Sequence, residues 1–385
     1  MYNYTGTEVD TIYTYDGDVV EAGSDSGYVT APEYINVNGN SYRLTWHDEF
    51  DAKDINKDFW DDVQFISNVQ RRYQSWTDYY LADGLLHLRI KKDAPDRFLD
   101  DPDNDVAQTM ILTGLNNNLH IITPSYHDIN PFWGLLVQEG YWECRFKVFP
   151  ATGGCHTAIW TCGIQDGENA LLTQAEIDVT EIKAHESTQL PHGVHPWTDS
   201  STTEFYTHSE AGVDFATGFH TVGFLWENGL MKWYVDGNVV DTKSNINTPQ
   251  YPMIIVLAAY KRISGTGWTG PADTTLGDVE FLVDYLRIYK KATSVSSGPV
   301  SVSSYTPITI NGNTRDMTID DNRGCPICFP SYVYINWSDG TRTEHWVKWN
   351  AINPTYQTKM TNHQSFEWAG YVYTLGMQIV ANVTY

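Results

Sequence analysis

Short segments in which apolar and polar residues alternate follow one another along most of the chain. The clearest segment covers residues 140–149, where two sets of side chains occupy alternate positions. Successive side chains of a β-strand point to opposite faces, so this period of two predicts a strand. One face would carry Tyr141, Glu143, Arg145 and Lys147, and the other Trp142, Cys144, Phe146 and Val148.

Turn signals separate the alternating segments at regular intervals. Gly84 lies between two of them, and the pair Asp236-Gly237 follows another, as in β-hairpins. No long segment has the period of an amphipathic helix. This regular spacing predicts an all-β domain, a single β-sandwich or jelly roll. The strands expected in it are 41–46, 79–82, 85–90, 140–149, 218–226, 231–235, 251–260 and 279–289.

Composition divides the chain into four parts. The first part is acidic and rich in Gly, Ser and Asp, with short strands expected at 11–15 and 34–37. A later Ser/Val/Thr-rich stretch with one Gly-Pro is typical of a linker. Beyond it, a strong hairpin is expected at 332–349 and a last strand at 378–385. We therefore expect an extension, a main domain, a linker and an accessory domain at residues 1–40, 41–291, 292–304 and 305–385.

Three carboxylates lie in one predicted strand, Ala175–Glu181 (AEIDVTE). Glu176 and Asp178 are two positions apart and should point to the same face. Glu181 is an odd number of positions from Glu176 and should point away from it. One extra residue, a β-bulge, would reset the alternation and bring Glu181 to the same face.

Three acids on one face repel one another, and the arrangement is useful where their charges are used. Glycoside hydrolysis needs two carboxylates a few ångströms apart, one to attack the anomeric carbon and one to protonate the leaving oxygen. The middle acid, Asp178, would help to keep Glu176 and Glu181 in different protonation states. The alternatives are a solvated acidic strand or a set of Ca²⁺ ligands.

The composition favours some partners over others. The 385 residues include 14 Trp and 25 Tyr, which fits both sheet packing and the stacking of sugars on flat rings. The net charge of −24 opposes binding to nucleic acid and to anionic membranes. It also disfavours a strongly sulfated polysaccharide, unless a local basic patch overrides it.

Cysteine usage gives no metal or redox site. The chain has five cysteines, so at least one is free unless it pairs between chains. The pair Cys325 and Cys328 has CxxC spacing, but a zinc site would need a second pair of ligands. We expect a local disulfide or two free thiols there.

No stretch of the sequence is long and apolar enough to span a membrane, and we expect no membrane insertion. The N-terminus lacks the charged and apolar regions of a signal peptide. We nevertheless expect an extracellular or cell-surface protein, whose leader has been trimmed or which is released by another route, for example by cell lysis. We also expect a monomer.

Residues 41–291 resemble glycoside hydrolase family 16. No single motif carries the resemblance, but eight occur in the order that the family shows. They are residues 46–50 (WHDEF), 82–86 (ADGLL), 140–147 (GYWECRFK), 154–160 (GCHTAIW), 176–181 (EIDVTE), 219–221 (FHT), 233–237 (WYVDG) and 283–289 (VDYLRIY).

The resemblance implies a concanavalin-like β-jelly-roll with a substrate cleft along its concave sheet. It implies an endo-acting, retaining hydrolase with Glu176 as the nucleophile, Glu181 as the acid/base and Asp178 assisting, without a catalytic cofactor. The spacing with an extra residue resembles the laminarinase, agarase, carrageenase and keratan-type branches. The best prediction is hydrolysis of β-1,3- or mixed β-1,3/1,4-glucan. The alternatives are an agar-, keratan- or mucin-like β-galactan and, from another class, a non-catalytic glycan-binding module.

The resemblance also indicates substrate-binding residues. Trp160 matches the Trp that lines the cleft, whereas His156 and Thr157 replace a usual Trp-Pro pair and leave the subsite specificity open. His195 and Trp197 follow the catalytic strand and are either cleft groups or structural. Further cleft candidates are Trp76, Trp133 and Trp268.

The resemblance to the hydrolase family also implies a metal site. Many family members hold a structural Ca²⁺ on the convex side, and Asp284 with backbone oxygens near Glu49 and Gly84 occupies the matching positions. Alternatively, Asp284 only forms hydrogen bonds with neighbouring backbone groups.

Residues 329–340 (FPSYVYINWSDG) resemble a bacterial immunoglobulin-like domain. We expect this unit to be a spacer rather than a carbohydrate-binding module.

Overall fold

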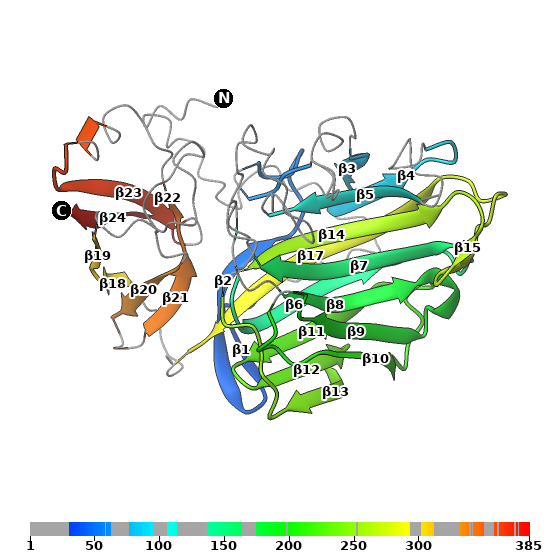
Figure 1. The fold of residues 1–385 in the computed structure, drawn as a ribbon, viewed down its shortest axis with the longest axis horizontal. Coiled ribbons are helices and arrows are strands. Elements are labelled where there is room, and N and C mark those ends of the chain that lie inside the picture. Colours follow the sequence, from blue (N-terminus) through cyan, green and yellow to red (C-terminus); the bar gives the residue numbers. More distant parts are fainter. Residues whose placement is uncertain are drawn as a thin grey trace.

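The computed structural model shows a chain built almost wholly of β-strands, as the alternating pattern predicted (Figure 1). The expected pair of faces in residues 140–149 is confirmed, because Trp142, Cys144, Phe146 and Val148 all lie in the core. The described part of the chain holds no helix with the length and apolar content needed to cross a bilayer. The structure describes residues 31–57, 59–62, 77–94, 106–113, 135, 137–163, 175–197, 199–251, 253–292, 302–311, 332–338, 340, 342–349, 358–359, 362–372, 375 and 377–385.

Two large sheets form the main domain. The first runs in the order β1 (Tyr34–Val37), β2 (Asn40–Asp48), β17 (Val279–Lys291), β6 (Gly140–Lys147), β11 (His220–Glu227), β12 (Leu230–Val235) and β13 (Asn238–Ser244), with the hairpin β3 (Tyr79–Ala82) and β4 (Leu85–Ile90) attached through β4 to β17. The second runs in the order β10 (Phe205–Glu210), β9 (Gln189–His195), β8 (Glu176–Lys183), β7 (Cys155–Gly163), β14 (Met253–Arg262) and β5 (Val106–Leu112).

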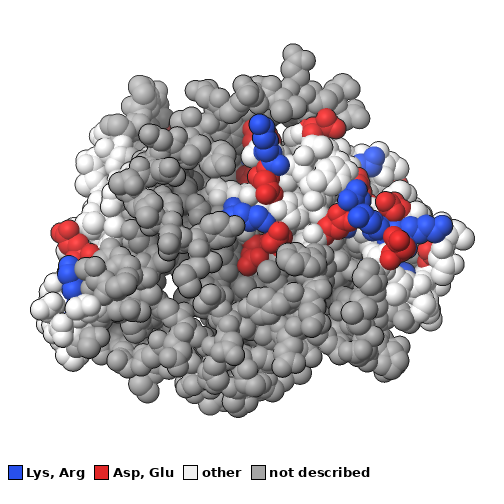
Figure 2. All heavy atoms as spheres, turned by 90° about the horizontal axis from the view of Figure 1, so that it is seen from above, with Lys and Arg blue, Asp and Glu red and all other residues white. Residues whose placement is uncertain are grey.

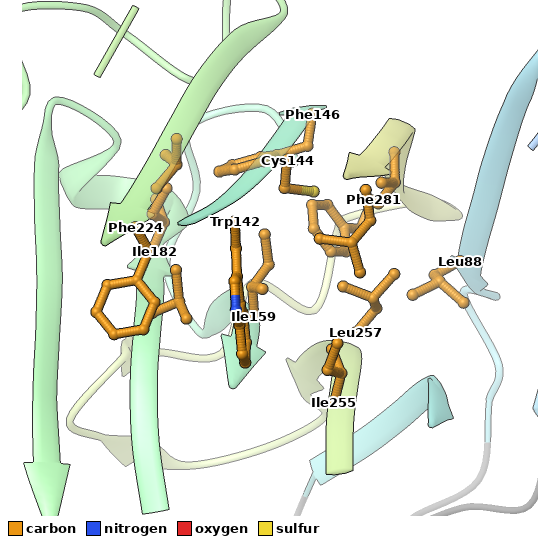
Figure 3. Close-up of a cluster of buried hydrophobic side chains, with 14 of the residues drawn as sticks. Leu88, Trp142, Cys144, Phe146, Ile159, Ile182, Phe224, Ile255, Leu257 and Phe281 are labelled. Carbon is orange, nitrogen blue, oxygen red and sulfur yellow. The ribbon is translucent and has the colours of Figure 1, made fainter. Parts of the chain in front are cut away.

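A hydrophobic core fills the space between these sheets (Figure 3). Trp142 and Phe146 of β6 project into it from the first sheet and Ile159 of β7 from the second. Phe146 stacks on Phe215 with ring centroids 5.3 Å apart. The inner face of each sheet is thus covered by the other, which leaves the outer face of the second sheet for chemistry.

A short hairpin, β15 (Thr266–Gly267) and β16 (Gly270–Pro271), follows β14 and lies at one end of the second sheet (Figure 1). The 3-10 helix η1 (Ala184–Glu186) follows β8. Both elements lie near the same end of β8, because a Cβ atom added at Gly270 would lie 3.5 Å from Cε1 of His185 in η1.

The C-terminal part forms two smaller sheets around their own core of residues such as Val333 and Ile335. The guanidinium group of Arg43 in β2 lies over the ring of Trp337, which joins this unit to the main domain. Its kinship with immunoglobulin-like domains stays a prediction. One sheet has the order β18 (Val302–Tyr305), β20 (Tyr332–Trp337), β21 (Arg342–Trp346), and the other β19 (Ile308–Asn311), β24 (Met377–Thr384), β23 (Phe366–Val372), β22 (Lys348–Trp349).

Acidic and basic side chains are intermixed on the face shown in Figure 2, wherever described residues form it. The expected strand at 34–37 is present as β1. Several other predictions lie outside the described residues: the strand at 11–15, the cysteines Cys325 and Cys328, and the cleft candidates Trp76 and Trp133.

Candidate active site

The predicted β-bulge in the acidic strand is confirmed. Consecutive residues of β7 pair with residues of β8, but one residue of β8 is skipped. Ile159 pairs with Thr180, whereas the next residue of β7, Trp160, pairs with Asp178. Val179 is therefore the extra residue of β8. Because β7 is regular, its alternate residues serve as a reference for which face each acid occupies.

All three acids point to the outer face of the second sheet. The β7 partners of Glu176, Asp178 and Glu181 are Cys162, Trp160 and Ala158. These three partners alternate along one strand and belong to one cluster, separate from the inter-sheet core. Directly paired residues share a face, so the bulge has brought Glu181 to the side of the other two acids.

A tryptophan of the opposite sheet holds the bulge in place. The indole Nε1 of Trp233 in β12 donates a 3.0 Å hydrogen bond to the backbone oxygen of Val179. Val179 itself is buried in the core. A bulged residue interrupts the ladder, and this bond satisfies its buried carbonyl, which would otherwise destabilise the strand.

Glu176 receives its own hydrogen bond. The indole Nε1 of Trp197 donates to Oε2 of Glu176 at 2.8 Å. Trp197 is 51% exposed and has a positive φ of 44°, a conformation that is uncommon for a bulky residue. An exposed aromatic ring that binds a carboxylate fits a wall of a binding site better than a core position.

Glu181 receives a bond from a residue that the sequence did not indicate, Tyr206 of β10. Its hydroxyl donates to Oε2 of Glu181 at 3.0 Å. The ring reaches across because Gly193 of β9 lies between them: a Cβ atom there would lie 2.7 Å from Cδ2 of Tyr206. Tyr206 lies two strands from the acids and outside the recognised motifs, so only the pairing of β8, β9 and β10 reveals it.

Asp178 is the most deeply placed acid, with 1% of its surface exposed. Its carboxyl group shares a hydrogen bond with Glu176. Nε2 of His195 lies 3.3 Å from Oδ2 of Asp178, and the imidazole stacks on Tyr206 with a centroid distance of 5.8 Å and is tilted against Trp197 at 5.5 Å. His195 and Trp197, both predicted, thus join the acids, with their roles still proposals.

Burial raises the pKa of all three carboxyl groups above ordinary values. For Glu176 the neighbouring Asp178 raises the pKa further, and the bond from Trp197 opposes the rise. For Asp178, Glu181 adds to the rise. For Glu181, Tyr206, His195 and Lys183 lower a pKa that burial raises. Like charges this close do not all ionise together, so the cluster holds protons under conditions in which free carboxylates would not.

Trp160 lies beside the acids and is 6% exposed, paired with Asp178 on β8 and Val256 on β14. His156 lies further along β7, paired with Lys183. It stacks on Tyr260 with a centroid distance of 4.2 Å and touches Trp268 at 4.8 Å. The other four predicted substrate-binding residues therefore fall in two groups, His195 with Trp197 at one end of the acids and His156 with Trp268 at the other.

The described side chains give no support for the predicted Ca²⁺ site. Arg287 binds both carboxylate oxygens of Glu49, at 2.9 and 2.7 Å. Asp284 is paired with Arg145, and Gly84 lies in the turn between β3 and β4. Arg145 thus already pairs with Asp284, the one carboxylate that the predicted site would contribute. In the ranges that the structure describes, no group of three His, Cys, Asp or Glu residues could hold a metal.

Three cysteines, Cys144, Cys155 and Cys162, are buried thiols that form no disulfide bond. Burial raises the pKa of the Cys144 thiol well above its usual range and that of Cys155 to about 12. Thiols that stay protonated are poor nucleophiles and metal ligands. The chemistry of the site therefore rests on its carboxyl groups.

Comparisons with known proteins agree with this geometry. Residues 137–286 match the sequence profile of the family described as "Glycosyl hydrolases family 16". The endo-1,3-1,4-beta-glycanase ExsH of Rhizobium meliloti (strain 1021) is 31% identical over 153 residues, which are 39% of this chain and 30% of that protein. The glucan endo-1,3-beta-glucosidase A1 of Niallia circulans is 24% identical over 278 residues, 64% of this chain and 38% of that protein. The chain thus spans less than half the length of these relatives.

Among solved structures, a GlcNAcα1-4Gal-releasing endo-β-galactosidase from Clostridium perfringens is similar to this chain with a TM-score of 0.58. The sequence identity is 18%, and the likeness covers 92% of this chain and 96% of that one. At this identity the likeness shows a shared fold and leaves the substrate to the residues of the site.

Proposed function

Because residues 137–286 match glycosyl hydrolases family 16, we propose that the protein is a retaining endo-β-glycanase that hydrolyses β-1,3- or mixed β-1,3/1,4-glucan. One observation carries the proposal: the bulge at Val179 places Glu176 and Glu181 on one face, on either side of Asp178. Each glutamate has a different hydrogen-bond donor, Trp197 for one and Tyr206 for the other. Two carboxyl groups in different environments are what retaining hydrolysis requires.

In the first step, ionised Glu176 attacks the anomeric carbon while protonated Glu181 donates its proton to the leaving oxygen. The glycosidic bond breaks as the bond between Glu176 and the sugar forms. Burial favours the protonated form of Glu181. The indole of Trp197 donates a hydrogen bond to Glu176, which lowers the pKa of this carboxyl group and favours its ionised form.

In the second step, Glu181, now ionised, takes a proton from a water molecule that attacks the same anomeric carbon. Glu176 leaves as a carboxylate and the product keeps its β configuration. Asp178 keeps its proton throughout, because burial and the neighbouring acids disfavour its ionised form. His195 lies over Asp178 and lowers the pKa of Glu176 and Glu181 when it is charged.

Several observations support a glucan as the substrate. The two curated relatives carry names that specify β-1,3- and β-1,3-1,4-linked substrates. Trp197 and Trp268, the most exposed tryptophans of the described chain, lie at opposite ends of the acids, where they would stack on sugar rings. A polysaccharide is too large to enter a cell intact, so we propose that the enzyme is extracellular. We also propose that it is a monomer and that its C-terminal unit is a spacer.

The test is hydrolysis of a panel of polymers with sizing of the products. We expect the wild-type protein to cut laminarin or lichenan internally and to leave agarose intact, and the first products observed by NMR to be β anomers. Glu176→Gln and Glu181→Gln should each lower the rate by at least about 10³-fold without a loss of thermal stability. Unchanged hydrolysis by Glu176→Gln would refute the assignment, and cleavage of agarose or mucin glycans alone would replace glucan by a β-galactan. Binding without cleavage would indicate a glycan-binding module.

A further inference from the structure

The hairpin β15–β16 is fixed against the end of the second sheet. The backbone N–H of Gly154 donates a 2.8 Å bond to the oxygen of Thr269. A Cβ atom at Gly153 would lie 2.6 Å from the oxygen of Pro271, and one at Gly154 would lie 2.9 Å from Cα of Ala272. Only glycines allow this approach, so the hairpin has a set position.

The hairpin presents an aromatic platform. Trp268, between its two strands, is 49% exposed. Its ring is supported by His156, and the ammonium group of Lys183 lies 5.3 Å from its centroid. Lys183 is two residues beyond Glu181 on the same face of β8 and lowers the pKa of that acid. The platform therefore lies next to the proposed acid/base.

A positive charge at the base of the hairpin lacks a protein partner. Arg262, the last residue of β14, makes no side-chain hydrogen bond or ion pair in the part of the chain that the structure describes, and its Nε atom is buried without an acceptor. Its Nη2 atom lies against Gly267, where a Cβ atom would be only 2.4 Å away. A buried guanidinium donor without an acceptor is costly to keep.

The charges nearby leave this arginine uncompensated. The only carboxylate paired with the basic groups of the platform, among described residues, is Glu186, which binds Lys183 at 2.9 Å and contacts His185 at 3.4 Å. Arg262 adds a positive charge that no described residue pairs with, in a protein whose net charge is −24. Such an arginine suits an anionic ligand, because its planar donors match carboxylate and sulfate oxygens.

We propose that Trp268, Arg262 and Lys183 form a subsite for an acidic sugar unit, one that carries a carboxylate or a sulfate ester, on the Glu181 side of the cleavage point. The sugar ring stacks on Trp268, and the oxygens of the anionic group accept hydrogen bonds from the N–H groups of Arg262. This inference rests on the proposed hydrolase function and narrows it. The preferred substrate is then an acidic β-linked polysaccharide rather than a neutral glucan.

The first measurement is binding by calorimetry to Glu176→Gln protein, which separates recognition from turnover. The probes are β-1,3-glucan oligosaccharides of one length in neutral, carboxymethylated and sulfated forms. We expect one anionic form to bind about 10-fold or more tightly than the neutral form, and the advantage to shrink as salt rises. Which anionic form binds better distinguishes a carboxylate from a sulfate. Equal affinity for all three forms would overturn the subsite.

Variants then locate the effect. In the same Glu176→Gln background, Arg262→Gln should remove the preference for the anionic form, and Arg262→Lys should keep part of it, because the charge remains. Arg89→Gln is the matched control: it removes one positive charge from β4 of the other sheet, where Arg89 is paired with Asp78 at 2.8 Å. A preference that persists in Arg262→Gln, with unchanged melting temperature, would refute the role of this arginine.

Activity measurements separate this proposal from the proposed function. With wild-type protein, faster cleavage of the anionic polymer than of laminarin supports both the acidic-sugar subsite and the hydrolase function. Equal cleavage of the two polymers, together with equal binding, overturns the subsite and leaves the hydrolase assignment intact. No cleavage of any polymer overturns the hydrolase assignment, while the calorimetry still decides whether Arg262 recognises an anion.

Discussion

The hydroxyl group of Tyr206 donates a 3.0 Å hydrogen bond to Oε2 of Glu181. The two residues are on β10 and β8, and β9 lies between them with Gly193 at the crossing point. Burial and the nearby acids raise the pKa of the Tyr206 hydroxyl far above its usual value. Tyr206 therefore keeps its proton and acts only as a donor to Glu181, which favours the ionised form of that acid.

Tyr206→Phe should move the alkaline side of the pH–rate profile. The bond from Tyr206 lowers the pKa of Glu181, so its removal raises that pKa. Glu181 then stays protonated to higher pH, and activity as the general acid persists to higher pH. The rate at the optimum should fall roughly fivefold, the value of one neutral hydrogen bond. The measurement is kcat/KM against pH.

Tyr42→Phe is the control for this variant. It also removes one hydroxyl group bound to a glutamate, since Tyr42 donates to Glu227 at 2.6 Å, but on the first sheet. Its profile should match that of the wild type. If Tyr206→Phe shifts the acidic side instead, Glu181 is the nucleophile and the two roles must be exchanged.

Trp197→Phe should move the opposite side of the profile. The indole donor lowers the pKa of Glu176, so its loss raises the pH at which this carboxyl group ionises. Since a nucleophile works only when ionised, the acidic side of the profile should shift to higher pH and the alkaline side should stay in place. A shift of the alkaline side would contradict the assignment of Glu176.

Trp233→Phe tests the anchor of the bulge. The change leaves the carbonyl of Val179 without its 3.0 Å bond from Trp233, which should cost about 1–3 kcal/mol of stability. If the bulge relaxes, Glu181 turns away from Asp178 and kcat falls further than stability alone explains. Trp226→Phe is the control, because it removes the same volume from the core and its buried Nε1 atom bonds no other described group. Equal rates in the two variants would refute the anchoring role.

Asp178→Asn should stabilise the protein at neutral pH. Burial raises the pKa of Asp178 in the folded state, so the wild-type protein loses stability as pH rises from the unfolded pKa through the folded one. An amide cannot ionise and avoids this loss. We expect a melting temperature roughly 2–4 °C higher at pH 7. The gain should vanish below about pH 4, where Asp178 is protonated in both states.

The same variant should remain partly active. Asparagine can keep the hydrogen bond that Asp178 shares with Glu176, so the rate should fall less than in Glu176→Gln. Thermal melts at pH 7 and pH 3.5, with rates measured on one substrate, decide both points. A lower melting temperature at pH 7 would show that ionised Asp178 stabilises the fold.

Much of the site could be predicted from local sequence. The period of two in residues 140–149 predicted which side chains of β6 enter the core, because strand geometry fixes alternate faces. The spacing of Glu176, Asp178 and Glu181 predicted a bulge, which the pairing with β7 confirms. These features depend on neighbours along one strand, and the sequence records such neighbours directly.

Other features depend on which strands pair and were not predictable in this way. Tyr206 reaches Glu181 only because β9 and β10 follow β8 in the sheet. Arg262 meets Gly267 only because the hairpin folds back on β14. The ion pairs of Arg145 with Asp284 and of Arg287 with Glu49 also arise through tertiary contacts and were not predicted.

By itself, the sequence determined an all-β chain, several of its strands and a bulged strand with three acids, because backbone alternation and turn residues act locally. Only the tertiary structure decided how each acid is protonated and bound. That depends on burial and on donors such as Trp197, Tyr206 and Trp233, which lie outside the acidic strand. Their effect on the pKa of a carboxyl group requires a distance of a few ångströms, and only the packing of strands against one another sets such distances.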